Sequence, residues 1–234
     1  MKNILAITLA RGGSKGIKNK NIVKINSKPL IAYTIIEARK SKLINEYIVS
    51  TDSLEIAKVA QNYGASVPFI RPKNLSSSKA TSASALKHAL NFMEKKNSIK
   101  YDYVVELMCT NPLKTVFDID SSIKKILKYR CNAVIAVHKL EDHHPSRIKK
   151  IVNGELKNFC IPEKKESRRQ DLKPDAYIRS GSIYVLKRDY LVKNNRRHGN
   201  IGVIPYILPQ DRAINIDSPI DLITAEMMFK NGKA

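Results

Sequence analysis

The sequence contains no tryptophan, only 5 phenylalanines and 10 tyrosines, and 21 acidic residues against 42 basic ones. Single-stranded nucleic acids are commonly bound by aromatic side chains set along a basic groove. Here the lysines and arginines are spread over the whole chain, and no basic run is interleaved with aromatic residues. The formal charge of +21 therefore predicts affinity for anions such as phosphorylated or carboxylated small molecules, and nucleic acid is not the partner we expect.

Cysteine is scarce as well. Cys109, Cys131 and Cys160 are widely spaced and form no CxxC pair. We therefore expect small buried side chains in a reducing compartment, with neither a disulfide framework nor a zinc site.

Long hydrophobic runs are missing too. None reaches the roughly 18–20 residues that cross a bilayer. The short apolar run behind Lys2 is not followed by a small-residue cleavage site, so a signal peptide is not expected. These absences favour a cytoplasmic protein without a membrane partner.

What is present suits a single domain over residues 1–234. Of these residues 43% are hydrophobic and 27% charged, which is enough to build a core, and there is no internal repeat or long linker. The expected strands in the first two thirds are 3–8, 46–51, 65–71, 101–108 and 132–139, and the expected helices are 29–41, 52–64, 81–96 and 118–129. This alternation predicts an α/β fold with a mostly parallel sheet and helices on both faces.

Several boundaries carry their own signals. Asp52 or Ser53 is expected to cap the helix at 52–64, and Gly64 to end it. Pro68 makes 65–71 an edge strand, because proline has no N–H to donate to a neighbour.

The alternation breaks from about Glu141. Residues 141–178 are polar, interrupted by prolines and rich in basic side chains, which is typical of a small insertion or arm. Two strands, 181–191 and 201–209, are expected after it, and a final helix follows with Pro219 in its first turn.

A glycine-rich basic loop, LARGGSKGIKNKN (9–21), directly follows the first strand, where ligands of parallel sheets bind. Its glycine spacing fits neither the P-loop GxxxxGK[ST] nor the dinucleotide loop GxGxxG. Glycines allow backbone N–H groups to approach an oxyanion, Arg11 can hold a phosphate through two parallel hydrogen bonds, and Lys15 and Lys20 add point charges. The loop suits a triphosphate that loses pyrophosphate; the alternative is a solvated lysine-rich turn.

The loop and several later segments, in the same order, resemble the acylneuraminate cytidylyltransferase (CMP-sialic acid synthetase) family, which includes CMP-legionaminic and CMP-pseudaminic acid synthetases. The segments are ARGGSKGIKNKNI (10–22), IVSTDSLEIAKVAQNYGA (48–65), RPKNLSSSKATSASALKHAL (71–90), ELMCTNPLK (106–114), DHHPSR (142–147), SRRQDL (167–172), GSIYV (181–185) and INIDSPIDLITAE (214–226).

The resemblance implies a Rossmann-like nucleotidyltransferase fold with a small dimerisation and sugar-binding arm at about 139–179, which swaps onto a partner in a homodimer. It also implies the reaction. CTP binds over the glycine loop, and the anomeric hydroxyl of a nine-carbon acidic sugar attacks the α-phosphate. Pyrophosphate leaves, assisted by Mg²⁺ (or Mn²⁺).

The resemblance further implies roles for individual residues. The expected phosphate-binding and catalytic residues are Arg11, Lys15 and Lys20; the loop contacts are Gly12, Gly13 and Ser14; Asn21 lies beside the nucleotide; Arg147 and Arg169 on the arm face the acidic sugar or the phosphates across the dimer; and Asp217 holds the metal. Asp217 has an alternative role as a helix cap, because Ser218 and Pro219 follow it. For Arg169 the alternative is a solvated charge pair with Arg168.

The sequence departs from the family at four positions. Met108 stands where the family often has a glutamine that reads the cytosine edge, and Ser78 where it usually has an aspartate. Asn215 replaces one of two aspartates found in several relatives, and Lys18 replaces a common proline. These changes keep the phosphate-binding residues and leave open how cytosine is read, how many metal ions bind and which sugar is used.

Two alternatives to this reaction stay open from the sequence. One is a nucleotidyltransferase for another acidic sugar or another nucleoside triphosphate. The other is a family member that binds nucleotide or nucleic acid without turnover.

Overall fold

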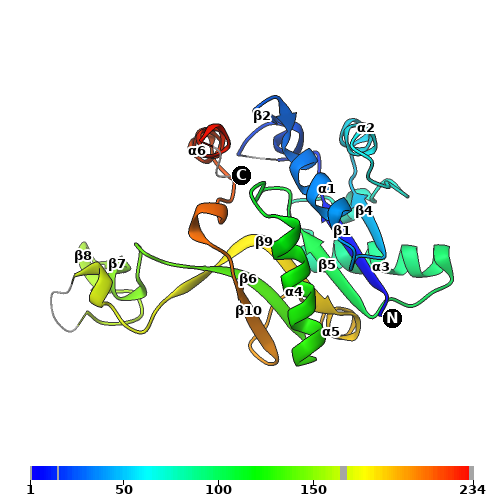
Figure 1. Cartoon of the computed structure of the whole chain (residues 1–234). Helices are drawn as coiled ribbons and strands as arrows, with labels where there is room; N and C mark the ends of the chain where they lie inside the picture. The colour runs from blue at the N-terminus through cyan, green and yellow to red at the C-terminus, as the bar shows by residue number, and fades with distance from the viewer. Residues whose placement is uncertain (1, 15, 164–167, 232–234) are drawn as a thin grey trace.

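A six-stranded sheet forms the centre of the molecule (Figure 1). The computed structural model describes residues 2–14, 16–163 and 168–231. The strand order is β10 (Val203–Ile207), β6 (Ala133–Lys139), β9 (Tyr177–Lys187), β5 (Tyr103–Leu107), β1 (Ile4–Leu9) and β4 (Glu46–Ser50). β4, β1 and β5 are parallel, as are β6 and β10, whereas β9 runs antiparallel to both β5 and β6. The mostly parallel sheet is therefore confirmed.

Helices cover both faces of this sheet. Because side chains of a strand alternate between faces, β1 directs Ile4 and Ala6 toward one face and Leu5 and Ile7 toward the other. The first face packs against α1 (Leu30–Lys40) and α4 (Val116–Tyr129), and the second against α3 (Ser82–Asn97) and α5 (Arg188–Asn194). α2 (Leu54–Asn62) packs beside α1 in a third apolar cluster.

The helix boundaries follow from caps in the sequence. Ser53 caps α2, because its side chain accepts the N–H of Ile56 at 3.3 Å, and Gly64 follows the helix with φ +85°. Of the two expected caps for α2, Ser53 is the one used. Asp52 instead accepts the backbone N–H of Gly12 at 2.9 Å, so its carboxylate supports the glycine loop.

Two expected strands need correction. Residues 65–71 form no strand but only two isolated bridges, from Ser66 to Ile48 of β4 and from Ile70 to Thr51 just after β4, since Pro68 between them cannot donate a hydrogen bond. The strand expected over 181–191 ends at Lys187, and α5 begins at Arg188. The apolar residues of α5 had been attributed to the strand, although Leu191 packs as a helical residue in the core.

The chain after the glycine loop packs against the last helix. η1 (Lys20–Ile22) leads into a tight hairpin of β2 (Lys24–Ile25) and β3 (Lys28–Pro29). α6 (Pro219–Lys230) lies next to this hairpin (Figure 1) and shares an apolar cluster with it. This packing places the start of α6 beside the glycine loop.

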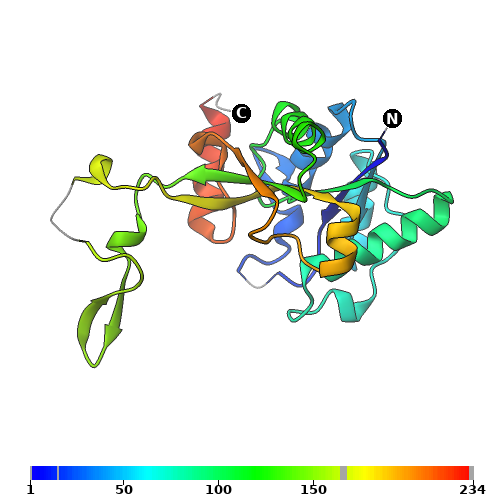
Figure 2. The ribbon, with the colours of Figure 1, turned by 90° about the horizontal axis from the view of Figure 1, so that it is seen from below.

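The segment between β6 and β9 extends away from the body of the molecule, as Figures 1 and 2 show. It contains η3 (Pro145–Arg147), the hairpin of β7 (Lys149–Val152) and β8 (Glu155–Asn158), and η4 (Arg169–Asp171). Two short 3-10 helices, η2 (Lys73–Leu75) and η5 (Gln210–Arg212), belong to the body. None of the helices in the described part of the chain has the length and apolar character to cross a membrane.

The β6–β9 ladder is interrupted three residue pairs before the extension begins at Lys139 and Tyr177. The register shifts between Ile135 and Val137, opposite residues that include Gly181. Gly181 has φ +62°, and a Cβ there would lie 3.1 Å from Oδ1 of Asn215. The glycine therefore permits both the left-handed backbone and the close approach of the segment before α6.

Candidate active site

A cavity of about 280 Å³ opens at the carboxyl ends of β1 and β5. Its lining residues are Leu9, Arg11, Ser14, Gly16, Lys20, Asn21, Ser82, Glu106, Met108, Cys109, Thr110 and Asp217. A second cavity of about 310 Å³ shares Leu9, Arg11 and Ser82 with the first and extends toward η2. Its further lining residues are Arg71, Leu75, Ser77, Ser78, Ala80, Thr81 and Ala85. We call these the main cavity and the side cavity.

The main cavity brings together many of the predicted site residues. Arg11, Ser14, Lys20, Asn21 and Asp217 all line it, although Asp217 is almost two hundred residues away from the loop in sequence. Gly12 and Gly13 belong to the same loop. Lys15 lies outside the described residues.

Lys20 and Asp217 form an ion pair across the main cavity. Lys20 Nζ donates to Asp217 Oδ1 at 2.7 Å and to the carbonyl oxygen of Ile216 at 3.0 Å. The lysine side chain is largely buried, whereas that of Asp217 is 66% exposed. The exposed carboxylate leaves the pair open to solvent and to an incoming ligand.

The glycine loop is shaped by close backbone packing. A Cβ added to Gly16 would lie 2.5 Å from the backbone oxygen of Asp217, whereas a Cβ on Gly13 would meet nothing within 4 Å. Asn21 fixes the loop from beneath, because its Nδ2 donates to the carbonyl of Arg11 at 2.8 Å and its Oδ1 accepts from Cys109 at 2.9 Å. These bonds give Asn21 a structural task, and its contact with a nucleotide stays a prediction.

A buried asparagine holds the segment that carries Asp217. Asn111 Nδ2 donates to the carbonyl oxygens of Arg212 at 3.0 Å and Ile214 at 2.8 Å, and its Oδ1 accepts from Ser182 at 3.0 Å. The carbonyl of the neighbouring Thr110 also accepts the N–H of Ile216 at 2.8 Å. The end of β5 thereby fixes the backbone immediately before Asp217.

The alternative role of Asp217 as a helix cap is wrong. Ser218 is the N-cap of α6, and it forms a capping box with Asp221. Asp217 contributes only its backbone N–H, which Asp221 accepts at 3.0 Å, so its carboxylate is not used by the helix.

The residues near Asp217 fit a single divalent cation. Asn215 donates to Asp217 Oδ2, and Asn215 Oδ1 is buried without a hydrogen-bond partner among the described residues. Carboxylate and amide oxygens are the ligands a hard cation prefers, and Mg²⁺ commonly uses one or two carboxylates together with substrate phosphates. Across the described ranges no cluster of three or more His, Cys, Asp or Glu side chains could hold a metal by protein ligands alone.

Sequence reasoning missed an ion pair in which one partner, Glu106, lies in the wall of the main cavity. Arg197 Nη1 donates to Glu106 Oε2 at 2.8 Å, and its guanidinium lies 4.7 Å from the ring centroid of Tyr184. Burial raises the pKa of Glu106, and Arg197 opposes that rise. A charged residue inside the apolar run YVVEL was the available signal for Glu106, whereas nothing in NNRRHGN singles out Arg197.

Arg71 was also missed as a site residue, although it begins one of the segments that resemble the family. It is buried beneath the side cavity, where Nε donates to Ser76 Oγ at 3.1 Å and Nη2 lies 4.0 Å from Asp52. Burial lowers the pKa of this guanidinium, and the nearby Arg11 adds to that effect. Arg11 and Arg71 make the boundary between the two cavities strongly basic.

The cysteines offer no activated nucleophile. Burial raises the pKa of Cys109 to about 11, which disfavours a thiolate. Cys131 is partly buried and Cys160 is exposed, so the expectation of buried cysteines is correct only for Cys109.

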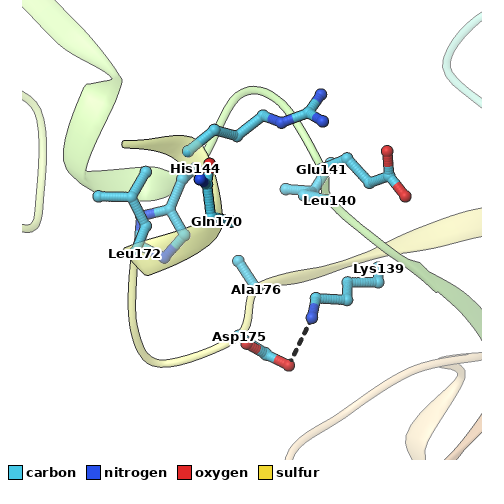
Figure 3. A pocket seen from close by; sticks show the side chains of 9 residues that line it. Lys139, Leu140, Glu141, His144, Gln170, Leu172, Asp175 and Ala176 are labelled. Atoms are coloured by element: carbon cyan, nitrogen blue, oxygen red, sulfur yellow. Dashed lines mark ion pairs between the residues drawn. The ribbon is translucent and has the colours of Figure 1, made fainter. Parts of the chain in front are cut away.

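The two arginines predicted on the arm lie apart from the main cavity. Arg147 ends η3, and Arg169 lines a separate hollow of about 260 Å³ in the extension, shown in Figure 3. In this hollow Lys139 pairs with Asp175 at 2.7 Å, and His144 is hydrogen-bonded to Ser146 and to the carbonyl of Pro174. Arg168 and Arg169 are both exposed, and Arg168 pairs with Asp171 at 2.8 Å, so the alternative of solvated charges stays open for Arg169.

Comparison with known proteins identifies the family of this chain. The sequence model of the family described as cytidylyltransferase matches residues 5–188. The chain is similar to the pseudaminic acid cytidylyltransferase of Campylobacter jejuni subsp. jejuni serotype O:23/36 (strain 81-176), at 35% identity over 98% of this chain and 97% of the relative. It is similar to the CMP-N,N'-diacetyllegionaminic acid synthase of Campylobacter jejuni subsp. jejuni serotype O:2 at 35% identity, over 98% of this chain and 96% of the relative.

A solved structure, CMP:2-keto-3-deoxy-manno-octonic acid synthetase complexed with CTP, matches with a TM-score of 0.72 at 15% identity, covering 99% of this chain and 100% of that chain. This likeness defines the class as an α/β protein of the Rossmann-like nucleotidyltransferase fold. With the family match and nearly full-length relatives, the chain belongs to the cytidylyltransferase family. The resemblance found in the sequence is confirmed.

Proposed function

We propose that this chain transfers CMP from CTP to the anomeric hydroxyl of a nine-carbon acidic sugar of the sialic, legionaminic or pseudaminic acid type, with release of pyrophosphate. The main support is family membership over nearly the whole chain, combined with a cavity in which Arg11, Lys20 and Asp217 converge. Nucleotidyl transfer depends mostly on positioning and on neutralising charge. The cavity supplies both.

Arg11 and Lys20 hold the phosphates of CTP in this proposal. The backbone N–H of Gly13 and the hydroxyl of Ser14, which lines the main cavity, would contact the same phosphates. Lys20 exchanges its present partner Asp217 for a phosphate oxygen, which needs little rearrangement because Nζ already lies in the cavity wall. Lys15 is expected to add a further positive charge.

Asp217, with Asn215 beside it, would hold Mg²⁺ together with phosphate oxygens of CTP, and the cation would neutralise charge on the leaving pyrophosphate. The pairing of Asn215 with Asp217 Oδ2 orients the carboxylate for this purpose. The buried network of Asn111 keeps the carboxylate at a fixed distance from the loop.

In the transfer step, the anomeric oxygen of the sugar forms a bond to the α-phosphorus while the bond from that phosphorus to the β-phosphate oxygen breaks. The hydroxyl proton is released, and the products are the CMP-sugar and pyrophosphate. Arg11 and Lys20 hold the leaving pyrophosphate, where negative charge increases in the transition state.

We further propose that the arm, residues 139–179, joins two chains into a homodimer, and that Arg147 and Arg169 act on the acidic sugar or the phosphates in the partner's cavity. The two arginines lie on the extension, away from the main cavity of their own chain. The β7–β8 hairpin supports the proposal, because it exposes large apolar side chains. These are Ile151 at 76%, Leu156 at 73% and, directly after it, Phe159 at 62%.

The decisive experiment measures pyrophosphate release with Mg²⁺, each of the four nucleoside triphosphates and a panel of nine-carbon acidic sugars. The two Campylobacter relatives are equally similar to this chain and are named for different sugars, so the panel includes pseudaminic and N,N'-diacetyllegionaminic acids. Product with CTP and one of these sugars is the expected result. Product only with another nucleotide or another class of sugar, or salt-sensitive nucleic-acid binding without product, would contradict the proposal.

A further inference from the structure

The wall of the main cavity contains one carboxylate that neither the phosphates nor the cation requires. Glu106 lines the cavity near the end of β5, yet its side chain is only 2% exposed. A triphosphate and an acidic sugar are both anions, and an uncompensated carboxylate would repel them. The presence of Glu106 therefore calls for an explanation within the site.

Arg197 supplies the compensating charge and is itself held in place. Its Nη1 donates to Glu106 Oε2 at 2.8 Å and contacts Met108 Sδ at 3.6 Å, while the guanidinium lies over the ring of Tyr184. Glu106 and Tyr184 are directly opposite each other on β5 and β9. Two neighbouring strands thus fix the orientation of the guanidinium before any ligand binds.

Hydrogen-bonding capacity remains on both partners. Arginine has five N–H donors, and within the described residues the hydrogen bonds of Arg197 all start from Nη1. The ion pair uses Oε2 of Glu106, and no described residue donates to Oε1. A carboxylate oxygen accepts hydrogen bonds from hydroxyl and amide N–H groups, and a guanidinium donates to a carbonyl oxygen.

The two cavities differ in the ligand they suit. The side cavity is lined by small residues, two leucines, Arg11 and the buried Arg71, a mixture of apolar and hydrogen-bonding groups that suits a nucleobase. The main cavity continues from the phosphate-binding residues to Glu106 and Met108. Arg197 contacts both of these residues, and 22% of its side chain stays exposed. A sugar is rich in hydroxyl donors, and the sugars that name the legionaminic relative carry acylamino groups.

We propose that Glu106 and Arg197 are specificity-determining residues for the acceptor sugar, with Glu106 Oε1 accepting from a hydroxyl or acylamino N–H and Arg197 donating to the acylamino carbonyl. This inference rests on the proposed function. It explains why a carboxylate is kept in a cavity for anions.

The test compares Arg197→Lys and Glu106→Gln with the wild type in steady-state kinetics, with the sugar and CTP varied separately. Loss of a hydrogen bond to a charged group corresponds to roughly a 10- to 100-fold loss in binding. We expect the KM for the sugar to rise by about that factor, while the KM for CTP changes less than about 2-fold. Because breaking one partner of a buried pair can unfold a protein, the neutral double variant Glu106→Gln/Arg197→Met is measured in parallel, with the same expected result.

A second sugar sharpens the test. This sugar is acidic and has a hydroxyl in place of the acylamino group. Replacing the acylamino sugar by it should raise the sugar KM strongly for the wild type and much less for Arg197→Lys, since the ion pair and the acylamino group act together. Glu94→Gln is the matched control, because Glu94 forms a comparable ion pair with Arg188 at 2.7 Å outside both cavities. Both KM values of this variant should match the wild type.

The outcomes separate the two proposals. This inference alone is overturned if the wild type transfers CMP but the variants keep its sugar KM. It is also overturned if the change of sugar raises the KM of Arg197→Lys as much as that of the wild type. A rise confined to the KM for CTP shows that the pair contacts the base, and it overturns the inference too. A wild type without transfer to any sugar overturns the proposed function and this inference together.

Discussion

Lys20 and Asp217 neutralise each other in the structure, although each has a separate predicted partner in CTP and its cation. The pair leaves no isolated charge in the cavity, and under the proposed function the binding of CTP and its cation would replace this one ion pair by two. Charges that face developing negative charge are worth more than charges on an open surface, because water is partly excluded there. Individual substitutions in this cavity should therefore have large kinetic effects and small effects on folding.

Lys20→Ala and Arg11→Ala are each expected to reduce kcat/KM by about 10²–10³, the size typical for loss of one group that stabilises an oxyanion. Pyrophosphate release measures the rate, and thermal unfolding checks that the fold is kept. Lys18→Ala is the control, since Lys18 is exposed on the same loop outside the cavity lining, and it should stay near the wild-type rate. Wild-type rates in Arg11→Ala and Lys20→Ala would count against the loop assignment.

Asp217→Asn tests the cation site. Without the carboxylate, Mg²⁺ retains only neutral protein oxygens, so half-maximal activity should require at least about 10-fold more Mg²⁺. A Mg²⁺ titration of initial rates at saturating CTP gives this value. Asp211→Asn, an exposed acid in η5, should leave it unchanged, and equal titration curves for both variants would remove Asp217 from the site.

Lys114 should make stability depend on pH. Its ammonium is buried against Thr34 Oγ1 at 2.7 Å and the carbonyl of Asn111, and burial lowers its pKa to about 7. An unfolded lysine keeps its proton up to about pH 10.4. Between these values the unfolded chain binds more protons, so the free energy of unfolding rises with pH from about 7 to 10.

Thermal unfolding from pH 7 to 10 measures this effect as a difference between variants. The rise in Tm with pH should be smaller in Lys114→Met than in the wild type, whereas Lys79→Met, which alters an exposed lysine, should retain the wild-type slope. Parallel curves for wild type and Lys114→Met would show that Lys114 does not titrate in this range.

At the scale of elements, the glycine loop and the start of α6 work as one unit. Gly16 packs directly on the backbone of Asp217, so the glycine loop and the proposed cation ligand are positioned by the same contact. A side chain at this contact must move one of the two elements.

Gly16→Ala is therefore expected to lower kcat by at least about 10-fold, because a Cβ at 2.5 Å from a backbone oxygen displaces the segment before α6. Gly13→Ala provides the matched control. Its Cβ would meet nothing within 4 Å and its backbone N–H is retained, so activity should stay within about 3-fold of the wild type. Equal losses in both variants would mean that loop flexibility, not this contact, is what matters.

Most elements could be predicted because their signals are local. The predicted strand 101–108 and helix 81–96 agree with β5 and α3 to within two residues at each end. Their signals, a buried β-branched run and the Thr81 cap, are visible in the sequence. The strand predicted at 65–71 fails because apolar content alone does not supply ladder hydrogen bonds around Pro68. α5 was missed because it follows β9 without a turn residue between them.

At the scale of the whole molecule, the site is assembled from segments far apart in the sequence. The loop residues were predictable, because glycine and charge cluster within one short stretch. The convergence of Asp217 on Lys20 was available only through resemblance, and the pairing of Glu106 with Arg197 was not available at all, since it depends on which loop packs over β9. Long-range pairs of this kind leave no local pattern.

The arm gives a prediction about assembly. Its apolar side chains face solvent in the single chain, and burial of such surface is the main driving force for stable association. Leu156→Glu should convert a dimer into a monomer, as measured by light scattering after size exclusion.

Ile201→Glu is the control for this experiment, because Ile201 is 83% exposed but lies in the body, before β10. That variant should remain dimeric. A wild type that is monomeric at micromolar concentration, or a dimer that survives Leu156→Glu, would contradict the proposed role of the arm.

The break in the β6–β9 ladder has a mechanical consequence. The break lies opposite Gly181, between the central part of the ladder and the three residue pairs that lead into the extension, and the side chain that packs against Gly181 is Asn215, two residues from Asp217. A change in the course of β9 at Gly181 would therefore displace Asn215 and, through it, the carboxylate expected to hold the cation. Under the proposed function, we expect association through the arm and cation binding to influence each other through this contact.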